Sequence, residues 1–319
     1  MALNRAPESQ AMTELILHHY DFSPFAEKIR LAFGLKGLAW RSVTQPSYMP
    51  KPDLVPLTGG YRHIPVMQAG ADVWCDTRCI ARELDRRQPA PPLMPPDLAA
   101  LATAVESWAE RDLFWPAVRF ASGVNADTMD PKLHVDRAAM RGKAAPSHER
   151  LRRAAGRSLA QLRPQLAIVE EMLGHGRPFL LADAPCQADL AVYHGLWFLS
   201  ALEIDCSADL APLKRTLAWM QRVAALGYGR VEPMSPQDAL SVAAGASPAP
   251  DGPSIEDDSL PPLGSTVSIR PEGYVTDAVV GVLASVGRLD LSLRRVDPVL
   301  GEMKVHFPRV GYEVMEVGA

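Results

Sequence analysis

Ser23 is the first residue whose type and position suggest chemistry, because it separates an apolar run, residues 15–20, from a helical stretch that begins at Pro24. Serine followed by proline commonly begins a helix, with serine at the N-cap and proline at N1, and this needs no function. The same geometry also suits a thiolate, since the positive end of a helix stabilises an anion and a hydroxyl can donate a hydrogen bond to it. The residues alone leave both interpretations open.

Ile64 and Pro65 form a second candidate, in which a proline stands where a strand should begin. Such a proline is expected at the edge of a sheet. If the bond between the two residues is cis, the amide and carbonyl of Ile64 instead face outward and can pair with an extended peptide ligand. The sequence does not decide the isomer.

Asp76 and Thr77 form a third candidate at the beginning of another helical stretch, residues 77–87. N-capping by itself explains an acid and a hydroxyl at this position. The same helix end could also bind a carboxylate through its amides and the Thr77 hydroxyl, while Asp76 accepts an ammonium group.

Residues 14–88 must position these three candidates, and their pattern alternates between strand and helix. An apolar run at 15–20, a helical stretch at 24–36 and a strand-like run at 40–44 are followed by two short strands and a helix. This order predicts a βαβ unit followed by a ββα unit.

Two proline-rich segments divide the rest of the chain. Residues 89–96, PAPPLMPP, are mostly prolines, which lack amide donors, and predict a linker. After it, apolar residues at spacings of three and four predict an all-α bundle over 97–230. Residues 231–263 are rich in Pro, Ala, Gly and Ser and predict a longer, mobile linker. Branched residues at period two over 264–319 predict a small antiparallel β barrel or sheet.

Composition and charge exclude several function classes. A net charge of −4 gives no basic bias for holding a phosphate backbone, so nucleic acid is not an expected partner. The longest uncharged apolar run, residues 190–202, is shorter than the roughly 20 residues that a membrane helix needs, so no membrane association is expected. The cysteines show no CxxC spacing and the histidines no HExxH motif, so we expect no metal and a cytoplasmic location.

The order of these features resembles the glutathione transferase family over residues 14–227, from the Ser-Pro helix start through Ile-Pro and Asp-Thr to the proline linker and the helical bundle. The resemblance is to cytosolic, omega- or theta-like members with serine at the catalytic turn. It implies an α+β multidomain fold, with a thioredoxin-like, glutathione-binding domain at 14–88 and an all-α domain at 97–230. The small C-terminal β domain at 264–319 is additional, and the resemblance also implies a homodimer.

The resemblance further implies roles for individual residues. Ser23 takes the position of the family's catalytic Ser or Cys. Ile64 and a cis Pro65 would hold the cysteinyl backbone of glutathione, and Asp76 with Thr77 would bind its γ-glutamyl end.

Three more glutathione contacts follow from the resemblance. Phe22 and Phe25 would wall the thiol pocket. Lys51, in a Lys-Pro-Asp stretch similar to one in omega-like members, would reach the glycyl carboxylate. Tyr20 is a competing donor to the thiol, but a tyrosine at a strand end more often packs, so Ser23 is favoured.

Serine at this turn excludes dithiol exchange, and a serine cannot form the mixed disulfide that cysteine-type members use. The resemblance therefore implies an enzyme that activates the glutathione thiol for attack on a small hydrophobic or electrophilic co-substrate, or on a hydroperoxide. Two alternatives stay open: a non-catalytic scaffold that binds a partner protein through the C-terminal β domain, and a glutathione-dependent lyase or isomerase.

Two further segments have structural explanations. Residues 132–163 hold nine Lys or Arg against two acids, which predicts a solvated helix face or, if the segment borders the cleft, a preference for anionic co-substrates. Within residues 179–190, Asp189 resembles the capping-box acid at the entry of a buried helix in the family's second domain. We expect Asp189 to accept backbone amides, although Cys186 replaces the usual Ser or Thr at the cap.

Overall fold

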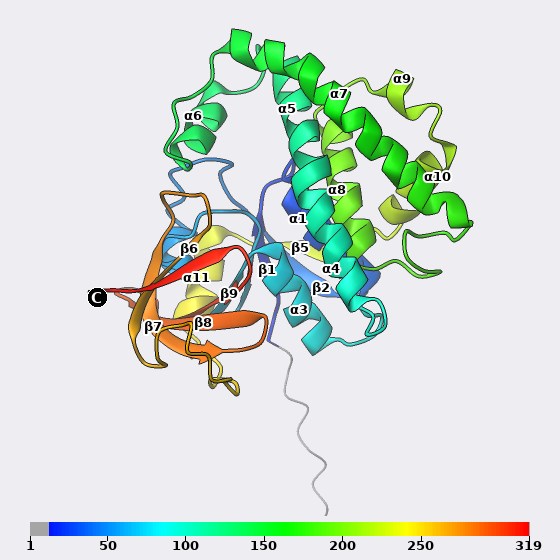
Figure 1. The fold of residues 1–319 in the computed structure, drawn as a ribbon. Helices are drawn as coiled ribbons and strands as arrows, with labels where there is room; N and C mark the ends of the chain where they lie inside the picture. Colours follow the sequence, from blue (N-terminus) through cyan, green and yellow to red (C-terminus); the bar gives the residue numbers. More distant parts are fainter. Residues whose placement is uncertain (1–12, 319) are drawn as a thin grey trace, which may run out of the picture.

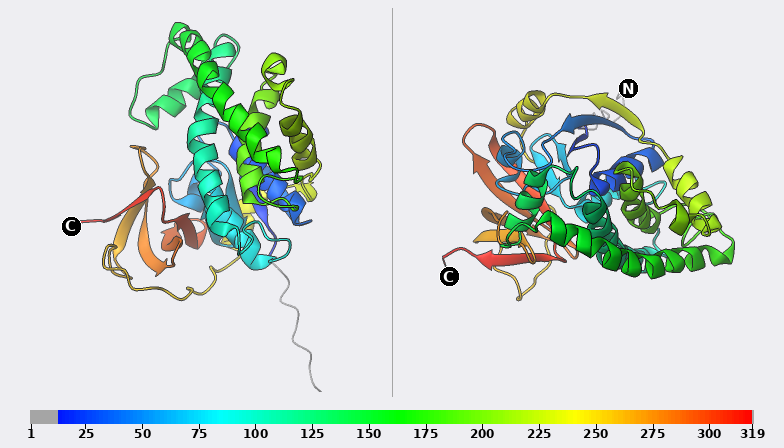
Figure 2. Two further views of the ribbon diagram at one scale, coloured as in Figure 1. Left: turned by 45° about the vertical axis from the view of Figure 1, so that its right-hand side comes forward. Right: turned by 90° about the horizontal axis from the view of Figure 1, so that it is seen from above.

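A ten-stranded sheet runs through the structure in the order β10-β6-β7-β8-β9-β4-β3-β1-β2-β5 (Figure 1). The structure is a computed structural model that describes residues 13–318. A helical domain covers one part of the sheet, and the C-terminal strands lie beside it (Figure 2).

The first unit is thioredoxin-like, as the sequence predicts. Strand β1 pairs in parallel with β2 and antiparallel with β3, which pairs antiparallel with β4. Helix α1 begins at the predicted Pro24. The bounds of its elements are β1 Ile16–His19, α1 Pro24–Leu35, β2 Ala39–Thr44, α2 Val55–Thr58, β3 Val66–Ala69, β4 Asp72–Cys75 and α3 Thr77–Arg87.

The second unit is all-α, which confirms the prediction from helical periodicity. Helix α8 lies at its centre, packed against α1, α4 and α5, and nearly every side chain of α8 is buried. A short π-helix, η1, interrupts the path from α4 to α5. The bounds are α4 Ala99–Trp108, η1 Ala109–Leu113, α5 Phe114–Val124, α6 Pro131–Ala139, α7 His148–Met172, η2 Leu173–His175, α8 Gln187–Ala201, α9 Ser207–Leu210 and α10 Lys214–Ala224.

Asp189 is a structural residue at the start of α8, as predicted. Its Oδ1 atom accepts hydrogen bonds from the Leu180 amide at 2.9 Å and from Trp219 Nε1 at 2.8 Å. Its Oδ2 atom accepts the amide of Cys186 at 3.0 Å. Burial raises the pKa of this carboxyl, and these donors partly oppose the rise.

The segment 231–263 differs from the mobile linker that its composition predicts. Strand β5, Arg230–Pro233, pairs in parallel with β2, and helix α11, Pro236–Ala244, follows it. Burial of small alanine side chains holds α11, because Ala239 packs with Ile16 and Val43, and its carbonyl accepts a hydrogen bond from the side chain of Gln68 at 2.9 Å. The free edge of β2 thus orders the first part of a segment whose composition resembles a linker.

The C-terminal strands form an open sheet, so of the two forms that their pattern predicts, a barrel or a sheet, the barrel is wrong and the sheet is confirmed. They are β6 Thr266–Pro271, β7 Val279–Val286, β8 Asp290–Asp297, β9 Gly301–Pro308 and β10 Tyr312–Glu316. Strand β9 pairs in parallel with β4, with Asp72 opposite Lys304 and Trp74 opposite His306. Because the edge of β4 offers unpaired backbone groups, these strands extend the first sheet instead of closing on themselves.

The C-terminal strands and the first unit share one apolar core. Leu57, Val66 and Val73 of the first unit belong to the same buried cluster as Leu293 and Phe307 of the C-terminal strands. The C-terminal region is therefore packed into the molecule by both hydrogen bonds and side chains. Within residues 13–318, every helix is too short or too polar to cross a membrane.

Candidate functional site

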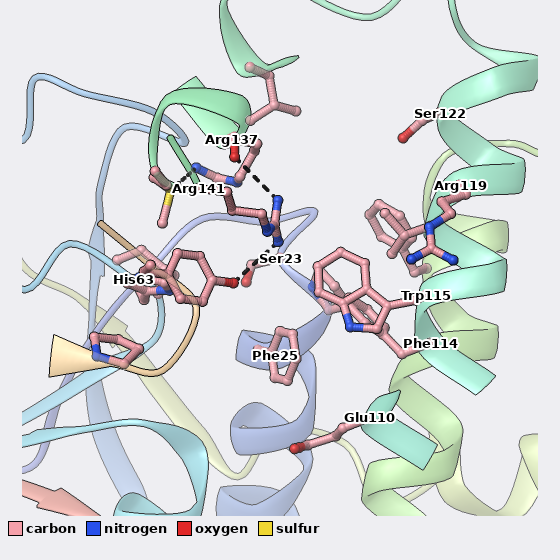
Figure 3. Close-up of a pocket in the computed structure, with 18 of the residues that line it drawn as sticks. Ser23, Phe25, His63, Glu110, Phe114, Trp115, Arg119, Ser122, Arg137 and Arg141 are labelled. Atoms are coloured by element: carbon pink, nitrogen blue, oxygen red, sulfur yellow. Dashed lines mark hydrogen bonds between the residues drawn. The ribbon is translucent and has the colours of Figure 1, made fainter. Parts of the chain in front are cut away.

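A cavity of about 1140 Å³ lies between the first unit, the helical domain and the C-terminal sheet (Figure 3). Seven of the eight side chains that the resemblance implies line it. They come from the β1–α1 turn, the segment before β3 and the start of α3: Phe22, Ser23, Phe25, Ile64, Pro65, Asp76 and Thr77.

Ser23 lies at the N-terminus of α1, with a relative exposure of 1%. Its Oγ atom accepts a hydrogen bond from the Ala26 amide at 3.2 Å, so Ser23 is the N-cap of the helix. A hydroxyl oxygen that accepts in this way keeps its own proton to donate. The structural and the chemical interpretations of Ser23 are therefore compatible, because the capping geometry also presents the hydroxyl to the cavity.

Phenylalanines flank this hydroxyl. The ring of Phe25 lies 4.9 Å from that of Phe114 on α5, and Phe22 lies 4.7 Å from Tyr20. Tyr20 also lines the cavity, but its hydroxyl is 3.4 Å from Arg137 Nη2, from which it can accept a hydrogen bond. Ser23 is thus buried between phenylalanines, whereas Tyr20 is only partly buried.

The peptide bond between Ile64 and Pro65 is cis. Within residues 13–318, neither the amide nor the carbonyl of Ile64 takes part in a hydrogen bond. These groups border the cavity and remain available to a ligand.

His63 also lines the cavity, and the sequence did not single it out as a candidate. Its Nε2 atom lies 3.0 Å from Asp277 Oδ2, and its ring stacks on Tyr61 at 5.0 Å. Burial lowers the pKa of His63, and the hydrogen bond to Asp277 opposes this only in part. Asp277 belongs to the segment between β6 and β7, so only the tertiary structure brings it to this histidine.

Asp76 caps α3 and carries a positive φ of 72°. Its Oδ1 atom accepts a hydrogen bond from the Arg78 amide at 2.9 Å, and Oδ2 lies 3.3 Å from the hydroxyl of Tyr312 on β10. Burial raises the pKa of the Asp76 carboxyl. Next to it, Thr77 at the start of α3 also lines the cavity.

A buried charge network supports this end of the cavity. Lys28 Nζ lies 2.8 Å from Glu106 and 2.5 Å from Glu110, and Arg78 lies 2.9 Å from the second oxygen of Glu110. Burial opposes ionisation, but Lys28 and Arg78 still hold the pKa of Glu110 below its usual value. The π-helical turn η1 carries Glu110 into the cavity, which fits the frequent occurrence of such turns at functional sites.

Lys51 is not brought into the site. Its ammonium group is buried outside the cavity lining and donates a hydrogen bond to the carbonyl of Arg62 at 3.0 Å. Burial, with the nearby positive charge of Arg137, lowers the pKa of Lys51 to about 7.

The basic segment 132–163 does border the cavity, with five of its nine cations. Five of them line it: Arg137, Arg141, Lys143, Arg150 and Arg157. The other four are exposed side chains outside the lining: Lys132, Arg152, Arg153 and Arg163. Opposite these cations, Phe114, Trp115 and Phe198 form an apolar wall. In the part of the chain that the structure describes, no group of three or more His, Cys, Asp or Glu could hold a metal ion.

Comparisons with known proteins agree on one fold. Residues 17–92 match the family profile "Glutathione S-transferase, N-terminal domain", and residues 128–226 match "Glutathione S-transferase, C-terminal domain". No curated protein matches the chain. Among solved structures, a GST-like protein from Pseudomonas syringae is 36% identical, over 96% of this chain and 100% of that chain, with a TM-score of 0.79.

More distant structures are similar in fold alone. A Tau class glutathione S-transferase from mango, Mangifera indica, is 16% identical over 67% of this chain and 90% of its own, with a TM-score of 0.52. A poplar glutathione transferase F1 variant is 13% identical over 73% of this chain and 100% of its own, with a TM-score of 0.53. The protein from P. syringae thus matches a larger share of this chain than these two do.

Proposed function

Because this chain belongs to the glutathione S-transferase family, we propose that it binds glutathione in the cavity that Ser23 lines and activates the thiol for attack on an electrophile. The observation that carries the proposal is the shared cavity, in which a helix-capping hydroxyl, the free backbone of Ile64 and the Asp76-Thr77 helix end all face one space.

The start of α3 would bind the γ-glutamyl end. A ligand α-carboxylate is a good acceptor for the first amides of a helix and for the Thr77 hydroxyl, while Asp76 offers a negative charge to an α-ammonium group. Burial raises the pKa of the Asp76 carboxyl, and a bound ammonium group would oppose that rise because it stabilises the charged form. This coupling supports recognition of a ligand that carries both charges.

Ser23 would then face the cysteinyl sulfur, with Ile64 alongside the cysteinyl backbone. A thiol with a reference pKa of about 8.5 is mostly protonated at neutral pH, and each unit of lowering needs about 1.4 kcal/mol of preference for the anion. A hydrogen bond to a charged group contributes about 1.5–3 kcal/mol, and a helix N-terminus about 0.3–1 kcal/mol. One or two units of lowering are therefore within reach of this site.

The reaction is nucleophilic substitution or addition at carbon. The thiol proton leaves to solvent, a bond forms between sulfur and carbon, and the electron pair passes to the leaving group or to a conjugated acceptor. A hydroperoxide is the second substrate type that suits a thiolate: two glutathione thiols and one hydroperoxide give the disulfide, an alcohol and water. In either case Ser23 donates a hydrogen bond and is not itself modified. Lys51 has no role in this proposal, because its ammonium group lies outside the cavity lining.

Calorimetric titration with glutathione, followed by a conjugation assay with a chloronitrobenzene, tests the proposal. We expect binding by the wild-type protein, and conjugation that falls at least tenfold in Ser23→Ala while glutathione still binds. Absence of glutathione binding would overturn the proposal. Binding with equal turnover in both proteins would remove Ser23 from the mechanism.

A further inference from the structure

On the side of the cavity that the helical domain forms, which we take as its co-substrate end, five cations form no ion pair with residues 13–318. They belong to α5, to the segment after α6 and to the first turns of α7, and we call them the cation cluster: Arg119, Arg141, Lys143, Arg150 and Arg157. Among residues 13–318, none of the five lies within ion-pair distance of a carboxylate. By contrast Arg78, at the other end of the cavity, is paired with Glu110.

Acidic groups do not offset the cluster. The cavity is lined by three carboxylates, Asp76, Glu110 and Glu272. The first two belong to the network around Lys28 and the start of α3, and Glu272 lies on the exposed turn after β6. Four of the five cations are exposed, so solvent screens much of the repulsion among them, and a bound anion would relieve the part that remains.

Arg141 is the member that the fold holds in place. Its guanidinium carbon lies 4.8 Å from the ring centroid of Trp115 on α5 and 5.2 Å from that of Tyr274 on the segment after β6. Its Nη2 atom donates to the Tyr274 hydroxyl at 3.2 Å, and Nη1 donates to the carbonyl of Arg137 at 3.2 Å. In Figure 3, where dashed lines mark hydrogen bonds, Arg141 lies beside Arg137 and faces the same space as Ser23.

These contacts orient the guanidinium of Arg141 so that it can bind a planar anion. Aromatic rings on a guanidinium fix its orientation, and its remaining N–H groups keep the fork geometry that matches a carboxylate. Because Tyr274 is one of the two aromatic residues that contact Arg141, the C-terminal region helps to orient this arginine. The backbone supports the same contact, since the Val275 amide donates to the carbonyl of Met140 at 2.9 Å.

Next to this group the cavity is apolar. Phe114, Val118, Leu133 and Phe198 line it and suit a hydrocarbon or aromatic body. We propose that the co-substrate end of the cavity binds an organic anion, a carboxylate on an apolar body, with Arg141 as its anchor and Tyr274 as the residue that positions Arg141. This inference rests on the proposed function and names the substrate class for it.

Two matched electrophiles test the inference: 4-chloro-3-nitrobenzoate and the neutral 4-chloro-3-nitrobenzamide. In both, the thiolate displaces chloride, so a sulfur–carbon bond forms, the carbon–chlorine bond breaks and the thiol proton leaves to solvent. After correction for the uncatalysed rates, we expect kcat/KM of the wild-type protein to be at least tenfold higher for the benzoate. Arg141→Met should lower kcat/KM at least tenfold for the benzoate and less than threefold for the amide.

Control variants separate charge from folding. Arg153→Met on α7 removes an exposed cation outside the cavity and should change neither value. Tyr274→Phe keeps the ring but loses the 3.2 Å hydrogen bond, so kcat/KM for the benzoate should fall about threefold while that for the amide is retained. Equal kcat/KM for the two electrophiles, or equal losses in Arg141→Met, would overturn the inference and leave the proposed function standing.

A binding measurement tests the anion site at Arg141 without requiring turnover. Calorimetric titration with the unreactive 4-nitrobenzoate should give binding that Arg141→Met weakens at least tenfold, while glutathione binding is unchanged. If neither electrophile is conjugated and glutathione does not bind, the proposed function fails, and this titration still decides whether the anion site exists. Absence of 4-nitrobenzoate binding to the wild-type protein would overturn the inference.

Discussion

The hydroxyl of Tyr312 lies 3.3 Å from Oδ2 of Asp76, although 236 positions separate the two residues in the chain. The same hydroxyl lies 3.2 Å from that of Tyr61. The carboxylate can only accept, so Tyr312 donates to it or to its tyrosine neighbour. A residue of the last strand thus supports the acid at the start of α3, and the C-terminal sheet takes part in the site.

Asp76→Asn should weaken glutathione binding about 10- to 100-fold. Asparagine caps a helix as well as aspartate does and tolerates the positive φ of 72° at this position, so only the charge is lost. A hydrogen bond to a charged group is worth about 1.5–3 kcal/mol, which corresponds to that range. Calorimetric titration measures the affinity and thermal unfolding checks the fold. Tyr312→Phe, which retains the charge, should have a smaller effect, and unchanged affinity in Asp76→Asn would remove the acid from glutathione recognition.

The pH dependence of conjugation should show whether the Ser23 hydroxyl stabilises the thiolate. A donor to the anion lowers the thiol pKa, so its removal should move the rising limb of kcat/KM to higher pH by about one unit, or about 1.4 kcal/mol. Ser23→Gly tests this cleanly, because glycine replaces serine at an N-cap at a cost of only a few tenths of a kcal/mol. Ser23→Thr retains a hydroxyl and should keep the wild-type profile. Superimposable profiles for wild type and Ser23→Gly would contradict the assignment.

Lys28→Met should lower the free energy of unfolding by about 3–5 kcal/mol. The substitution keeps an unbranched side chain of similar length but leaves the carboxylate of Glu106 without its buried cation and that of Glu110 paired with Arg78 alone. Urea denaturation measures the loss. The matched control is Arg153→Met, which breaks an exposed pair with Glu149 and should cost less than about 1 kcal/mol. Similar losses in the two variants would show that the buried network contributes little.

Acidification should destabilise the protein through three buried histidines. Burial lowers the pKa of His18 and His19 to about 4 and that of His194 to about 3. The unfolded chain binds protons near pH 6.5 and the folded chain does not, so stability is full above pH 6.5 and falls as the pH drops toward 4. Each histidine contributes a slope of about 1.4 kcal/mol per pH unit.

Urea denaturation between pH 7.5 and 5 measures this slope. His194→Phe should reduce the slope of unfolding free energy against pH by the contribution of one histidine. His148→Gln, at an exposed position, should leave the slope unchanged. Buried carboxyls with a raised pKa, such as that of Asp189, act in the opposite sense, so the difference between variant and wild type is the informative quantity. An identical slope in His194→Phe would contradict the prediction.

Removal of residues 261–319 should give an insoluble protein. It would expose the edge of β4 and the apolar side chains, including Val66 and Val73, that share a core with the C-terminal strands. Phe307→Ala, which is fully buried in that core, should cost about 3–5 kcal/mol. Val299→Ala is the control, since Val299 is 82% exposed. Gel filtration that returns a folded, monomeric truncated protein would contradict this prediction.

The features that the sequence determined are local ones. Ser23-Pro24 and Asp76-Thr77 begin helices where the sequence predicts them, because an N-cap is satisfied within three residues of its own position. Helical and strand periods likewise require only neighbouring residues, and they predict the order of elements in the first two units. Asp189 belongs to the same group, since a capping box links the acid to an amide three residues before it.

Contacts between distant segments were decided only by the tertiary structure. The pairing of β9 with β4, the approach of Tyr312 to Asp76 and the position of Arg141 between Trp115 and Tyr274 join segments with no shared local pattern. A strand edge accepts any backbone as its partner, so periodicity predicts strands but not where they pair, and only the structure decides that the C-terminal strands extend the first sheet and do not form a barrel. For the same reason the Lys-Pro-Asp stretch does not determine where Lys51 binds, and packing decides that its ammonium group donates to the carbonyl of Arg62.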